Sequence, residues 1–475
     1  MTASRRPLAE IVGAIGGSRV LAGPPDVSIV DITHDSRAVV PGSLFCCVRG
    51  TLRDGHDFAS VAVERGAVAV LVDHELDLPS GVTQILVADV RAAIGPVASE
   101  LFGNPSRQMT VVGVTGTNGK TTTSHLLGAI LSADGVTTSV MGTLTGTLTT
   151  PEAADLQRSL ADMKAAGTRA VVMEVSSHAL ALDRVLGTSY SVAVFTNLGR
   201  DHLDFHGTQD AYFRAKARLF EPDLARVAVV NSDDVHGRRL IDAGRVPTIG
   251  FSAHDASDLT VTATSHAYTW AGHRIEVAMG GSVNVMNSLA AATTARELGI
   301  GVDVIAEGLR NAPVVAGRFE HIDVGQRFVV LVDFAHTPDG LAEVLRSVRQ
   351  ATTDGRVIVV FGCGGDRDKM KRPMMGETAA SLADAVVVTS DNPRSEDPEA
   401  IIASIVAGVP DHLRHRLVGV EPDRRAAMSL AFRHANEGDV VIIAGKGHER
   451  TQTIGTEVLE FDDRVVARQV LESLR

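Results

Sequence analysis

Apolar runs typical of β-strands alternate along this chain with segments whose apolar residues recur at helical spacing. The first such runs, at 43–48 and 67–72, are separated by turn residues, which predicts a small α/β domain over residues 1–105. An Asn-Pro-Ser triplet at 104–106 interrupts the pattern just before a strong apolar run. We therefore predict that the first domain ends at this triplet.

Two further blocks, residues 106–313 and 314–475, repeat the alternation of strand and helix, which predicts mostly parallel sheets covered by helices. Within the first block, residues 258–286 mix polar and apolar side chains and favour antiparallel strands. The second block has runs rich in Val and Ile, which predict strands buried on both faces. The fold class is therefore α/β in three domains. The main runs lie at 109–115, 170–175, 191–196, 227–231, 328–333, 357–361, 385–389 and 440–444.

Composition narrows the class of protein. Apolar residues make up 44% and charged residues 21% of the chain, as in ordinary globular domains. The pattern contains no membrane-spanning run or signal peptide, and Cys46, Cys47 and Cys363 are too few for a disulfide framework. We therefore expect a cytoplasmic protein. The net charge of −12 argues against broad binding to nucleic acids or membranes.

The polar motifs of the chain share one position, because each directly follows a predicted strand. Open α/β sheets bind ligands beyond the carboxyl ends of their strands, so these motifs predict clefts shared between domains. The motifs are TGTNGKTT, EVSSH, TNLGRDHLDFHG, DFAHTPD, GCGGDRD, DNPR and GKGHE.

The first motif has the composition of a phosphate-binding loop between a strand and a helix. Its glycines let backbone N–H groups approach phosphate oxygens, and the N-terminus of the following helix favours anions. Lys120 is expected to reach the β- and γ-phosphates of a nucleotide, and the Thr121 hydroxyl to hold Mg²⁺. Val114 replaces the first glycine of the common pattern, so a plain glycine-rich turn is the alternative. The loop residues are Gly116, Thr117, Asn118, Gly119, Lys120, Thr121 and Thr122.

Two more residues, Glu174 and Lys216, suggest metal-assisted chemistry. Glu174 ends an apolar run, where an acid commonly serves the metal of a nucleotide; a helix cap or surface acid is the alternative. Only six of the 45 basic residues are lysines, so Lys216 raises the question of what arginine could not do there. A neutral lysine amine can take up CO₂ as a carbamate, an oxygen ligand for a hard cation, whereas the alternative is an exposed cation. Spacing alone assigns His202 a structural or solvated role.

Together, the motifs from DSR at 35–37 to GKGHE at 445–449 resemble those of the Mur ligases of peptidoglycan synthesis, most closely the MurE type. The resemblance covers essentially the whole chain. It implies an N-terminal domain (1–105) that binds a UDP moiety and a central ATP-binding domain (106–313). It also implies a C-terminal Rossmann-like domain (314–475) that binds an amino acid.

The resemblance also implies roles for individual residues. Lys120, Glu174, His202 and Lys216 are the expected catalytic residues. Thr121 and Glu174 would hold one Mg²⁺, and a second would be held by Glu174, His202 and carbamylated Lys216. The expected contacts on the uridine side are Ser36, Thr51, Leu52 and Arg53. Those to the muramoyl dipeptide are Thr149, Thr150, Ser176 and Arg184. Those around the nucleotide are Asn284, Asn287, Arg318 and Asp333.

The DNPR motif is expected to select the amine. On its residues alone it is a turn before a helix. By the resemblance, Arg367 and Arg394 grip the distal carboxylate of diaminopimelate, which lysine lacks. Gly445 and Glu449 would meet the amino-acid end, with Glu449 as the partner of its ammonium. The motif comprises Asp391, Asn392, Pro393 and Arg394, and departures from the family's usual residues occur at Leu148, Leu182, Val283 and Phe334.

The function implied by the resemblance is a monomeric, ATP-dependent ligase. It would join diaminopimelate, the meso isomer by expectation, to the D-Glu γ-carboxylate of UDP-MurNAc-L-Ala-D-Glu through an acyl phosphate. One alternative is a lysine-adding or folylpolyglutamate-type ligase, against which DNPR and the long N-terminal domain argue. The other, from a different class, is a P-loop NTPase that acts as a switch and hydrolyses nucleotide without an amine.

Overall fold

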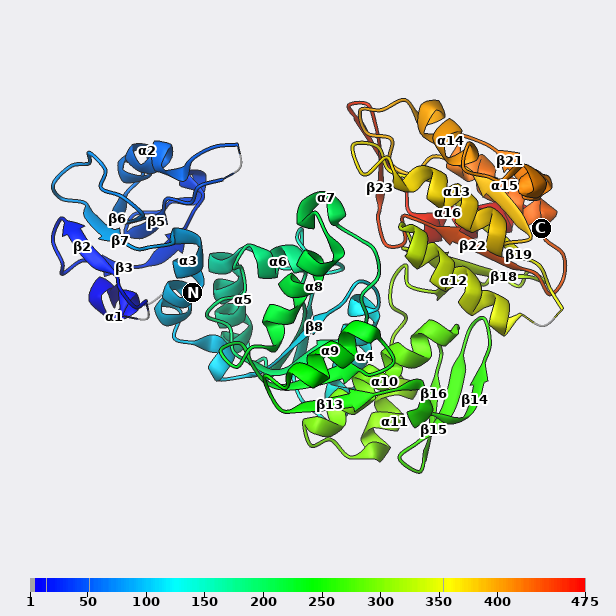
Figure 1. Cartoon of the computed structure of the whole chain (residues 1–475), viewed down its shortest axis with the longest axis horizontal. Coiled ribbons are helices and arrows are strands. Elements are labelled where there is room, and N and C mark those ends of the chain that lie inside the picture. Colours follow the sequence, from blue (N-terminus) through cyan, green and yellow to red (C-terminus); the bar gives the residue numbers. More distant parts are fainter. Residues whose placement is uncertain (1–4, 14, 51, 353, 475) are drawn as a thin grey trace.

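The computed structural model describes residues 5–13, 15–50, 52–352 and 354–474. Figure 1 shows three lobes in chain order, with the N-terminal lobe (blue) and the C-terminal lobe (yellow to red) on either side of a central one. Mostly parallel sheets in these lobes confirm the predicted α/β fold class. The boundaries predicted at 105/106 and 313/314 fall between the sheets and stay predictions. Within the described residues, no helix combines the length and the apolar character needed to cross a membrane.

The N-terminal lobe is built on a five-stranded sheet of order β2-β7-β6-β5-β4. The predicted runs at 43–48 and 67–72 form β5 and β6, which bury nearly every side chain because helices and loops cover both faces. The elements are β1 (Arg6–Pro7), α1 (Leu8–Val12), β2 (Arg19–Ala22), β3 (Ser28–Ile29), β4 (Asp31–Thr33), η1 (Ser36–Ala38), β5 (Ser43–Cys46), η2 (Gly55–Phe58), α2 (Ala59–Glu64), β6 (Ala67–Val72), β7 (Thr83–Leu86), α3 (Val90–Leu101) and η3 (Pro105–Arg107).

The central lobe contains a six-stranded sheet of order β13-β12-β11-β8-β10-β9 in which all neighbours are parallel. Helix α4 buries Leu126, Leu127, Ile130 and Leu131, the face that its 3.6-residue pattern predicts. The elements are β8 (Thr110–Thr115), α4 (Lys120–Ala133), β9 (Thr138–Met141), α5 (Ala153–Ala165), β10 (Ala170–Glu174), α6 (Ser177–Ala181), β11 (Tyr190–Phe195), α7 (Leu203–His206), α8 (Gln209–Ala217), η4 (Arg218–Phe220), β12 (Ala225–Asn231), α9 (Val235–Ala243), β13 (Thr248–Phe251) and η5 (Ala253–Asp255).

The antiparallel strands predicted over 258–286 are present but shorter. They are β14 (Ser257–Val261), β15 (His266–Trp270) and β16 (His273–Val277), in one three-stranded antiparallel sheet. The prediction is wrong for residues 282–286, which open helix α10 (Ser282–Glu297), followed by α11 (Val302–Arg310). Gly281, at φ +83°, turns the chain there, and the alanine-rich sequence that follows favours a helix.

The C-terminal lobe has a six-stranded sheet of order β17-β18-β22-β19-β20-β21, parallel except for the pairing of β17 with β18. The Val- and Ile-rich strands β19, β20 and β22 are buried throughout, as predicted. The elements are β17 (Glu320–His321), β18 (Val329–Asp333), α12 (Pro338–Ala351), β19 (Val357–Phe361), α13 (Lys371–Leu382), β20 (Ala385–Val388), α14 (Pro398–Val406), η6 (Asp411–Arg416), β21 (Leu417–Val420), α15 (Arg424–His434), β22 (Val440–Ala444), β23 (Thr451–Ile454), β24 (Glu457–Glu460) and α16 (Asp463–Ser473).

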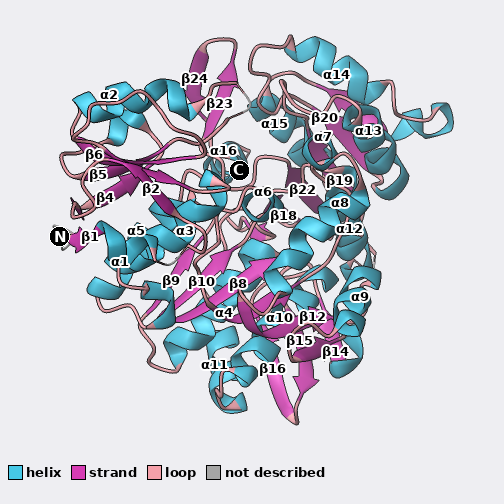
Figure 2. Ribbon diagram, turned by 60° about the vertical axis from the view of Figure 1, so that its left-hand side comes forward, coloured by secondary structure: helices cyan, strands magenta, loops and turns pink. Residues whose placement is uncertain are grey.

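Packed helices join the lobes. Helix α3 packs against α5 and also against the segment after α6, where a Cβ on Gly95 would lie only 2.0 Å from the carbonyl oxygen of Leu186, so glycine permits this second approach. Helices α10 and α12 lie side by side, and Leu289 and Leu341 belong to one hydrophobic core that spans the central and C-terminal lobes. Figure 2 shows the helices flanking the sheets in this arrangement. The carboxyl ends of β8, β10, β11 and β18 are thereby brought near one another.

A fully buried ion pair supports the second half of the C-terminal sheet. Arg424 donates from Nε and Nη2 to the carboxylate of Asp463 at 2.8 and 2.6 Å, and both side chains are 0% exposed. The same guanidinium donates to the carbonyl oxygens of Ser390 and Ala444, at 3.2 and 3.0 Å. Ser390 directly precedes the DNPR motif, and Ala444 directly precedes the GKGHE motif. The ion pair therefore fixes the backbone at the start of both motifs.

Replacing Asp463 with Ala would leave the Arg424 guanidinium buried without its counter-charge. Breaking a buried ion pair in this way costs about 3–5 kcal/mol. We expect a loss of that size in the free energy of unfolding, measured by urea denaturation followed by circular dichroism. The control is Glu472→Ala on the exposed face of the same helix, for which we expect a change within about 0.5 kcal/mol. Equal losses in the two variants would contradict this role of the pair.

Candidate functional site

The loop at 116–119 leads from β8 into the N-terminus of α4 and is held from the end of β11. The N–H groups of Thr117 and Asn118 donate to the carbonyl and side-chain oxygens of Asn197, each at 2.9 Å. Gly119 has φ +84°, and a Cβ on it would lie 2.3 Å from Oδ1 of Asn287. The loop conformation therefore requires glycine.

Two lysine amines lie inside this loop. Lys120 Nζ donates to the carbonyl oxygens of Gly116 and Thr117, at 2.9 and 2.8 Å. Lys216 Nζ, from α8, donates to the same Gly116 oxygen at 2.7 Å and faces the ring of Tyr212 at 4.6 Å. Lys216 is only 1% exposed, so the alternative of an exposed cation is wrong. Burial, and then the charge of Lys120, hold the pKa of Lys216 well below its ordinary value, which favours the neutral amine.

Glu174, at the end of β10, is buried beside the loop. Thr121 Oγ1 donates to its Oε2 at 3.0 Å. Thr143 donates from its N–H to Oε1 at 2.9 Å and from its hydroxyl to Oε2 at 3.1 Å. The side chain is therefore neither a helix cap nor a surface acid. Carboxylate and hydroxyl oxygens are hard ligands that suit Mg²⁺, so this pair fits the expected metal.

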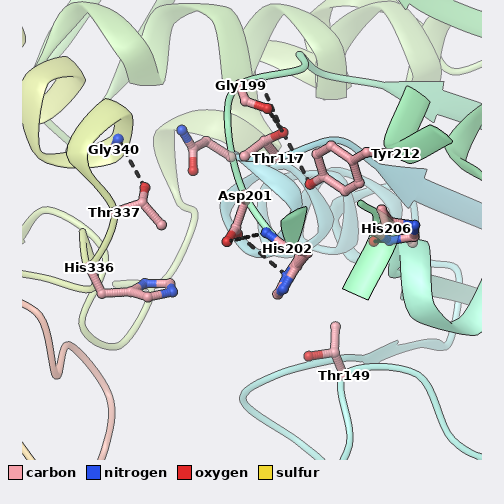
Figure 3. Close-up of polar contacts among 12 residues, drawn as sticks. Thr117, Thr149, Gly199, Asp201, His202, His206, Tyr212, His336, Thr337 and Gly340 are labelled. Carbon is pink, nitrogen blue, oxygen red and sulfur yellow. Dashed lines mark hydrogen bonds and ion pairs between the residues drawn. The ribbon is translucent and has the colours of Figure 1, made fainter. Parts of the chain in front are cut away.

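His202 and Asp201 lie at the mouth of this region, in the segment before α7. His202 has a left-handed backbone, with φ +52°, and its N–H donates to Asp201 Oδ1 at 2.8 Å. Its ring stands edge-on to His178 at 4.7 Å between centroids. Desolvation by the surrounding protein lowers the pKa of His202, although 43% of its side chain stays accessible from the cavity. Figure 3 shows His336, from the C-terminal lobe, directed toward these two residues.

The C-terminal lobe closes the other wall. Arg318 donates from Nη2 to Thr121 Oγ1 at 3.2 Å, and its guanidinium stacks over the ring of Phe334 at 4.4 Å. Phe334 thus keeps the aromatic face of the tyrosine usual in the family. Asp333 accepts the N–H groups of Phe319 and Ala335, at 2.9 and 2.8 Å. Burial raises the pKa of Asp333.

These residues line one cavity between the central and C-terminal lobes, which we term the first cavity. From the expected set it includes Thr117, Asn118, Gly119, Lys120, Thr121, Thr122, Thr149, Glu174, Ser176, His202, Lys216, Asn284, Asn287, Arg318 and Asp333. A second cavity is lined by the expected residues His202, Arg367, Asp391, Asn392, Arg394, Gly445 and Glu449. Asp201, His202, Phe334, His336 and Thr337 line both, so the two cavities adjoin.

In the second cavity, the two arginines expected to bind the distal carboxylate, Arg367 and Arg394, lie on different loops. Arg394 has a left-handed backbone at φ +53°, and its Nη1 donates to the carbonyl of Gly365 at 2.6 Å. Arg367 follows in the same loop as Gly365. Asn392 donates from Nδ2 to Glu449 Oε2 at 2.7 Å, which connects DNPR to GKGHE. Burial raises the pKa of Glu449.

Some expected residues lie beside the cavities or away from them. Thr150 Oγ1 donates to the carbonyl of Glu174 at 2.9 Å, and Arg184 donates to the carbonyl of Thr150 at 3.3 Å. They therefore support the wall that carries Ser176. The uridine-side set is in the N-terminal lobe and lines neither cavity: Ser36 opens η1, Leu52 is 95% exposed, Arg53 is exposed, and Thr51 lies outside the described residues.

Several lining residues were not predicted. Thr143, which gives Glu174 two hydrogen bonds, stands in a run of threonines and glycines that resembles any loop. Asp201 and His336 were inside recognised motifs, and their position after a strand was the signal that could have selected them. Glu343 accepts from Asn118 Nδ2 at 2.9 Å across the lobes, and burial raises its pKa. It lies within a helix, where spacing alone gives no hint of a site.

Comparison with family models gives three matches along the chain. Residues 28–102 match the "Mur ligase family, catalytic domain", residues 114–295 the "Mur ligase middle domain", and residues 317–447 the "Mur ligase, glutamate ligase domain". The three matches follow one another in the order of the three lobes.

Individual relatives agree with these matches. A "UDP-N-acetylmuramoyl-L-alanyl-D-glutamate--2,6-diaminopimelate ligase" of Syntrophomonas wolfei subsp. wolfei is 43% identical over 94% of this chain and 96% of its own. The protein of that name from Streptomyces avermitilis is 42% identical over 99% and 97%. A solved structure of a ligase with this name superposes with a TM-score of 0.70 at 31% identity, covering 100% of this chain and 99% of the other.

The buried amine of Lys216 makes stability depend on pH. Between its lowered folded pKa and the unfolded value of about 10.4, the unfolded chain binds one more proton, so stability falls as pH falls. Lys216→Met removes this proton, while Lys120 still donates to the Gly116 carbonyl. In CO₂-depleted buffer we expect the variant to be more stable than the parent, by a margin that grows from pH 9 to pH 7.

The growth of that margin is at most about 1.4 kcal/mol per pH unit between the folded and unfolded pKa values, and it is measured as free energies of unfolding at each pH. The control is Lys164→Met, because Lys164 lies at the exposed end of α5. We expect no comparable slope for it. A margin for Lys216→Met that is constant between pH 7 and pH 9 would contradict the neutral buried amine.

Proposed function

The chain belongs to the Mur ligase family, and we propose that it joins diaminopimelate to the D-Glu γ-carboxylate of UDP-MurNAc-L-Ala-D-Glu, with conversion of ATP to ADP and phosphate. Enzymes of this family are ATP-dependent ligases of peptidoglycan precursor synthesis. One observation carries the proposal. The phosphate loop lines the first cavity, and Arg367 and Arg394 line the second, which shares five lining residues with it, so a phosphorylated carboxylate and an amino acid can meet where the two adjoin.

ATP is assigned to the first cavity. Lys120 and the loop N–H groups would bind its phosphates, and Arg318 and Asp333 would approach it from the C-terminal lobe. Thr121 and Glu174 would hold one Mg²⁺, and Glu174, His202 and Lys216 a second. When bound, these ions neutralise the phosphate charge that otherwise repels the attacking carboxylate.

We further propose that Lys216 acts as a carbamate. Its amine is buried and favoured in the neutral form, which is the nucleophile that CO₂ requires. The carbamate converts a side chain without acceptor oxygens into an anionic oxygen ligand beside Glu174 and His202. Arginine cannot make this conversion, because its guanidinium stays charged.

The reaction would then run in two steps. The γ-carboxylate oxygen attacks the γ-phosphorus of ATP, the bond to the bridging oxygen breaks, and ADP leaves an acyl phosphate behind. The diaminopimelate amine attacks the acyl carbonyl, and the tetrahedral intermediate expels phosphate and loses the amine proton. Lys120 stabilises the negative charge on the transferred phosphoryl group, and the cavity walls align the two reactants.

The amine would enter through the second cavity. Arg367 and Arg394 would bind the distal carboxylate of diaminopimelate, and Glu449 its ammonium. Thr149, Thr150, Ser176 and Arg184 would position the dipeptide, while Ser36 and the loop at 51–53 would contact the uridine end. All these groups come from one chain, which is compatible with a monomer, and the use of ATP and a UDP-linked precursor is compatible with the cytoplasm.

Phosphate release tests the proposal with UDP-MurNAc-L-Ala-D-Glu, ATP and one amine at a time. We expect strong stimulation by meso-diaminopimelate and at least tenfold less by L-lysine, because lysine leaves the two arginines unpaired. LL-diaminopimelate measures the stereochemical preference. If only L-lysine stimulated phosphate release, the amine substrate would be L-lysine and not diaminopimelate. Phosphate release that no amine increases would favour a P-loop NTPase switch and refute the ligase.

Lys216→Ala tests the carbamate. We expect kcat to fall by at least about 10²-fold, the order of effect seen when an electrostatic group of the transition state is removed. Short carboxylic acids such as acetate should restore part of the activity, because they can supply the missing oxygen ligand. Lys164→Ala, with an exposed lysine, serves as the control. Full activity of Lys216→Ala without added acid would contradict the carbamate.

A further inference from the structure

A cluster of metal-ligating side chains lies in the N-terminal lobe, apart from both cavities. It contains His56, in η2, and Asp73 and His74, which directly follow β6. One potential ligand atom from each of the three lies within 4.8 Å of the others. The two imidazole rings are 4.5 Å apart between centroids. Segments 17 residues apart in sequence thus converge on one point.

The orientation of His56 is fixed by a carboxylate. Nδ1 lies 2.5 Å from Oδ1 of Asp54, and this contact assigns the ring proton to Nδ1. The lone pair is then on Nε2, which points to the interior. A carboxylate behind the far ring nitrogen is the arrangement that orients metal-bound histidines in proteins.

The inward nitrogen of His56 lacks a partner. The side chain is 5% exposed, and among the described residues Nε2 is buried without a hydrogen bond. Its neighbour is Oδ1 of Asp73, at 3.3 Å. Asp73 Oδ1 already accepts a hydrogen bond from Arg49 Nη2, whereas the lone pair of His56 Nε2 has no donor in the described part of the chain, and leaving this buried nitrogen unpaired is costly unless a cation binds it. Two ligands of a tetrahedral zinc ion are separated by about 3.4 Å, close to the distance present.

We propose that His56, Asp73 and His74 form a binding site for one divalent transition-metal ion of the zinc class. Two imidazole nitrogens and one carboxylate oxygen are a borderline donor set that selects Zn²⁺, Co²⁺ or Ni²⁺ over Mg²⁺ and Ca²⁺. His74 Nδ1 lies 2.5 Å from the same Asp73 oxygen, so by the same reasoning it carries a proton, which a metal ion bound to both groups would displace. Water would fill the fourth position.

Arg49 lies next to the proposed site and sets its charge. Its Nε is 2.8 Å from Oδ2 of Asp73, while its Nη2 donates to Oδ1 at 3.0 Å. A metal ion bound through Oδ1 would displace the Nη2 contact and leave the contact of Nε to Oδ2 in place. The two aspartates, Asp54 and Asp73, and this arginine leave one net negative charge, which favours a divalent cation but moderates the affinity.

A bound ion would tie two parts of the lobe together. Asp54 and His56 end the loop that begins at Arg49 and carries Leu52 and Arg53. Asp73 and His74 belong to the rigid end of the central strand β6. The ion would therefore fix the outer end of this exposed loop to the sheet. The inference rests on these contacts alone and does not depend on the ligase proposal.

The test measures zinc binding to the full, tag-free chain by competition with a chromophoric chelator, with excess Mg²⁺ present for the oxygen-rich site. We compare the parent with His74→Ala and with His56→Gln, which keeps a polar group beside Asp54. His74 is half exposed, so its replacement leaves the fold intact. The control is His34→Ala, because His34 is the third histidine of the lobe.

We expect the parent to bind one more equivalent of zinc than either variant, or to bind it at least tenfold more tightly. His34→Ala should match the parent. Equal stoichiometry and affinity in the parent, His74→Ala and His56→Gln would overturn the proposal, and His56 would then be an imidazolium between two carboxylates. Loss of the zinc equivalent in His34→Ala as well would also overturn it, since binding would not be specific to the cluster.

Discussion

The active region depends on removing two amines and one carboxylate from water at a single point. Lys120 and Lys216 share the carbonyl of Gly116, and Glu174 accepts hydrogen bonds from two threonines close by. The partners in these contacts are neutral carbonyl, hydroxyl and amide groups, so none of these hydrogen bonds pairs an ammonium group with a carboxylate. The arrangement is costly for the protein alone, and phosphate anions and divalent cations are the ligands that would relieve the cost. The N-terminus of α4 and the end of β10 place Lys120 and Glu174 at the cavity, where such ligands can reach them.

The cavity needs groups from two lobes, so its geometry depends on how the central and C-terminal lobes pack together. The central lobe supplies the phosphate loop and Glu174, whereas Arg318 and Asp333 come from the C-terminal lobe. Both sheets present the carboxyl ends of their strands to one cleft, where their backbone N–H groups and polar loops can serve a ligand. The shared core of α10 and α12 keeps these edges in contact, and Arg424 with Asp463 fixes the strand ends farther out.

Local pattern predicted the strands, the motif positions, the phosphate loop and Glu174, whereas most other lining residues were expected only from the resemblance to the Mur ligases. The alternation of apolar runs sufficed for the three sheets, and the residue after each strand marked the cleft. Prediction failed where tertiary contacts decide. Residues 282–286 have a mixed pattern that a glycine turn converts to helix, and Glu343 reaches Asn118 only because two lobes pack together. Thr143 likewise acquires its role from the fold of a featureless loop. Ser36, Leu52 and Arg53 line neither cavity. Whether they contact a ligand depends on how far that ligand extends toward the N-terminal lobe, and local sequence pattern does not give this.

The chain uses arginine and lysine differently at buried positions. Where a buried cation has a carboxylate partner, the chain uses arginine, as in Arg424 with Asp463 and Arg372 with Glu396. A planar guanidinium forms two bonds to a carboxylate and keeps its charge. At Lys216 a buried amine donates to a carbonyl oxygen, that of Gly116 at 2.7 Å, and has no carboxylate partner among the described residues, whereas Lys446 donates to the carbonyl of Thr451 at 2.6 Å and also lies 3.5 Å from Glu449 Oε2. An amine can lose its proton in such a place and a guanidinium cannot, so a lysine at position 216, where burial lowers the pKa, permits a neutral side chain that arginine would not.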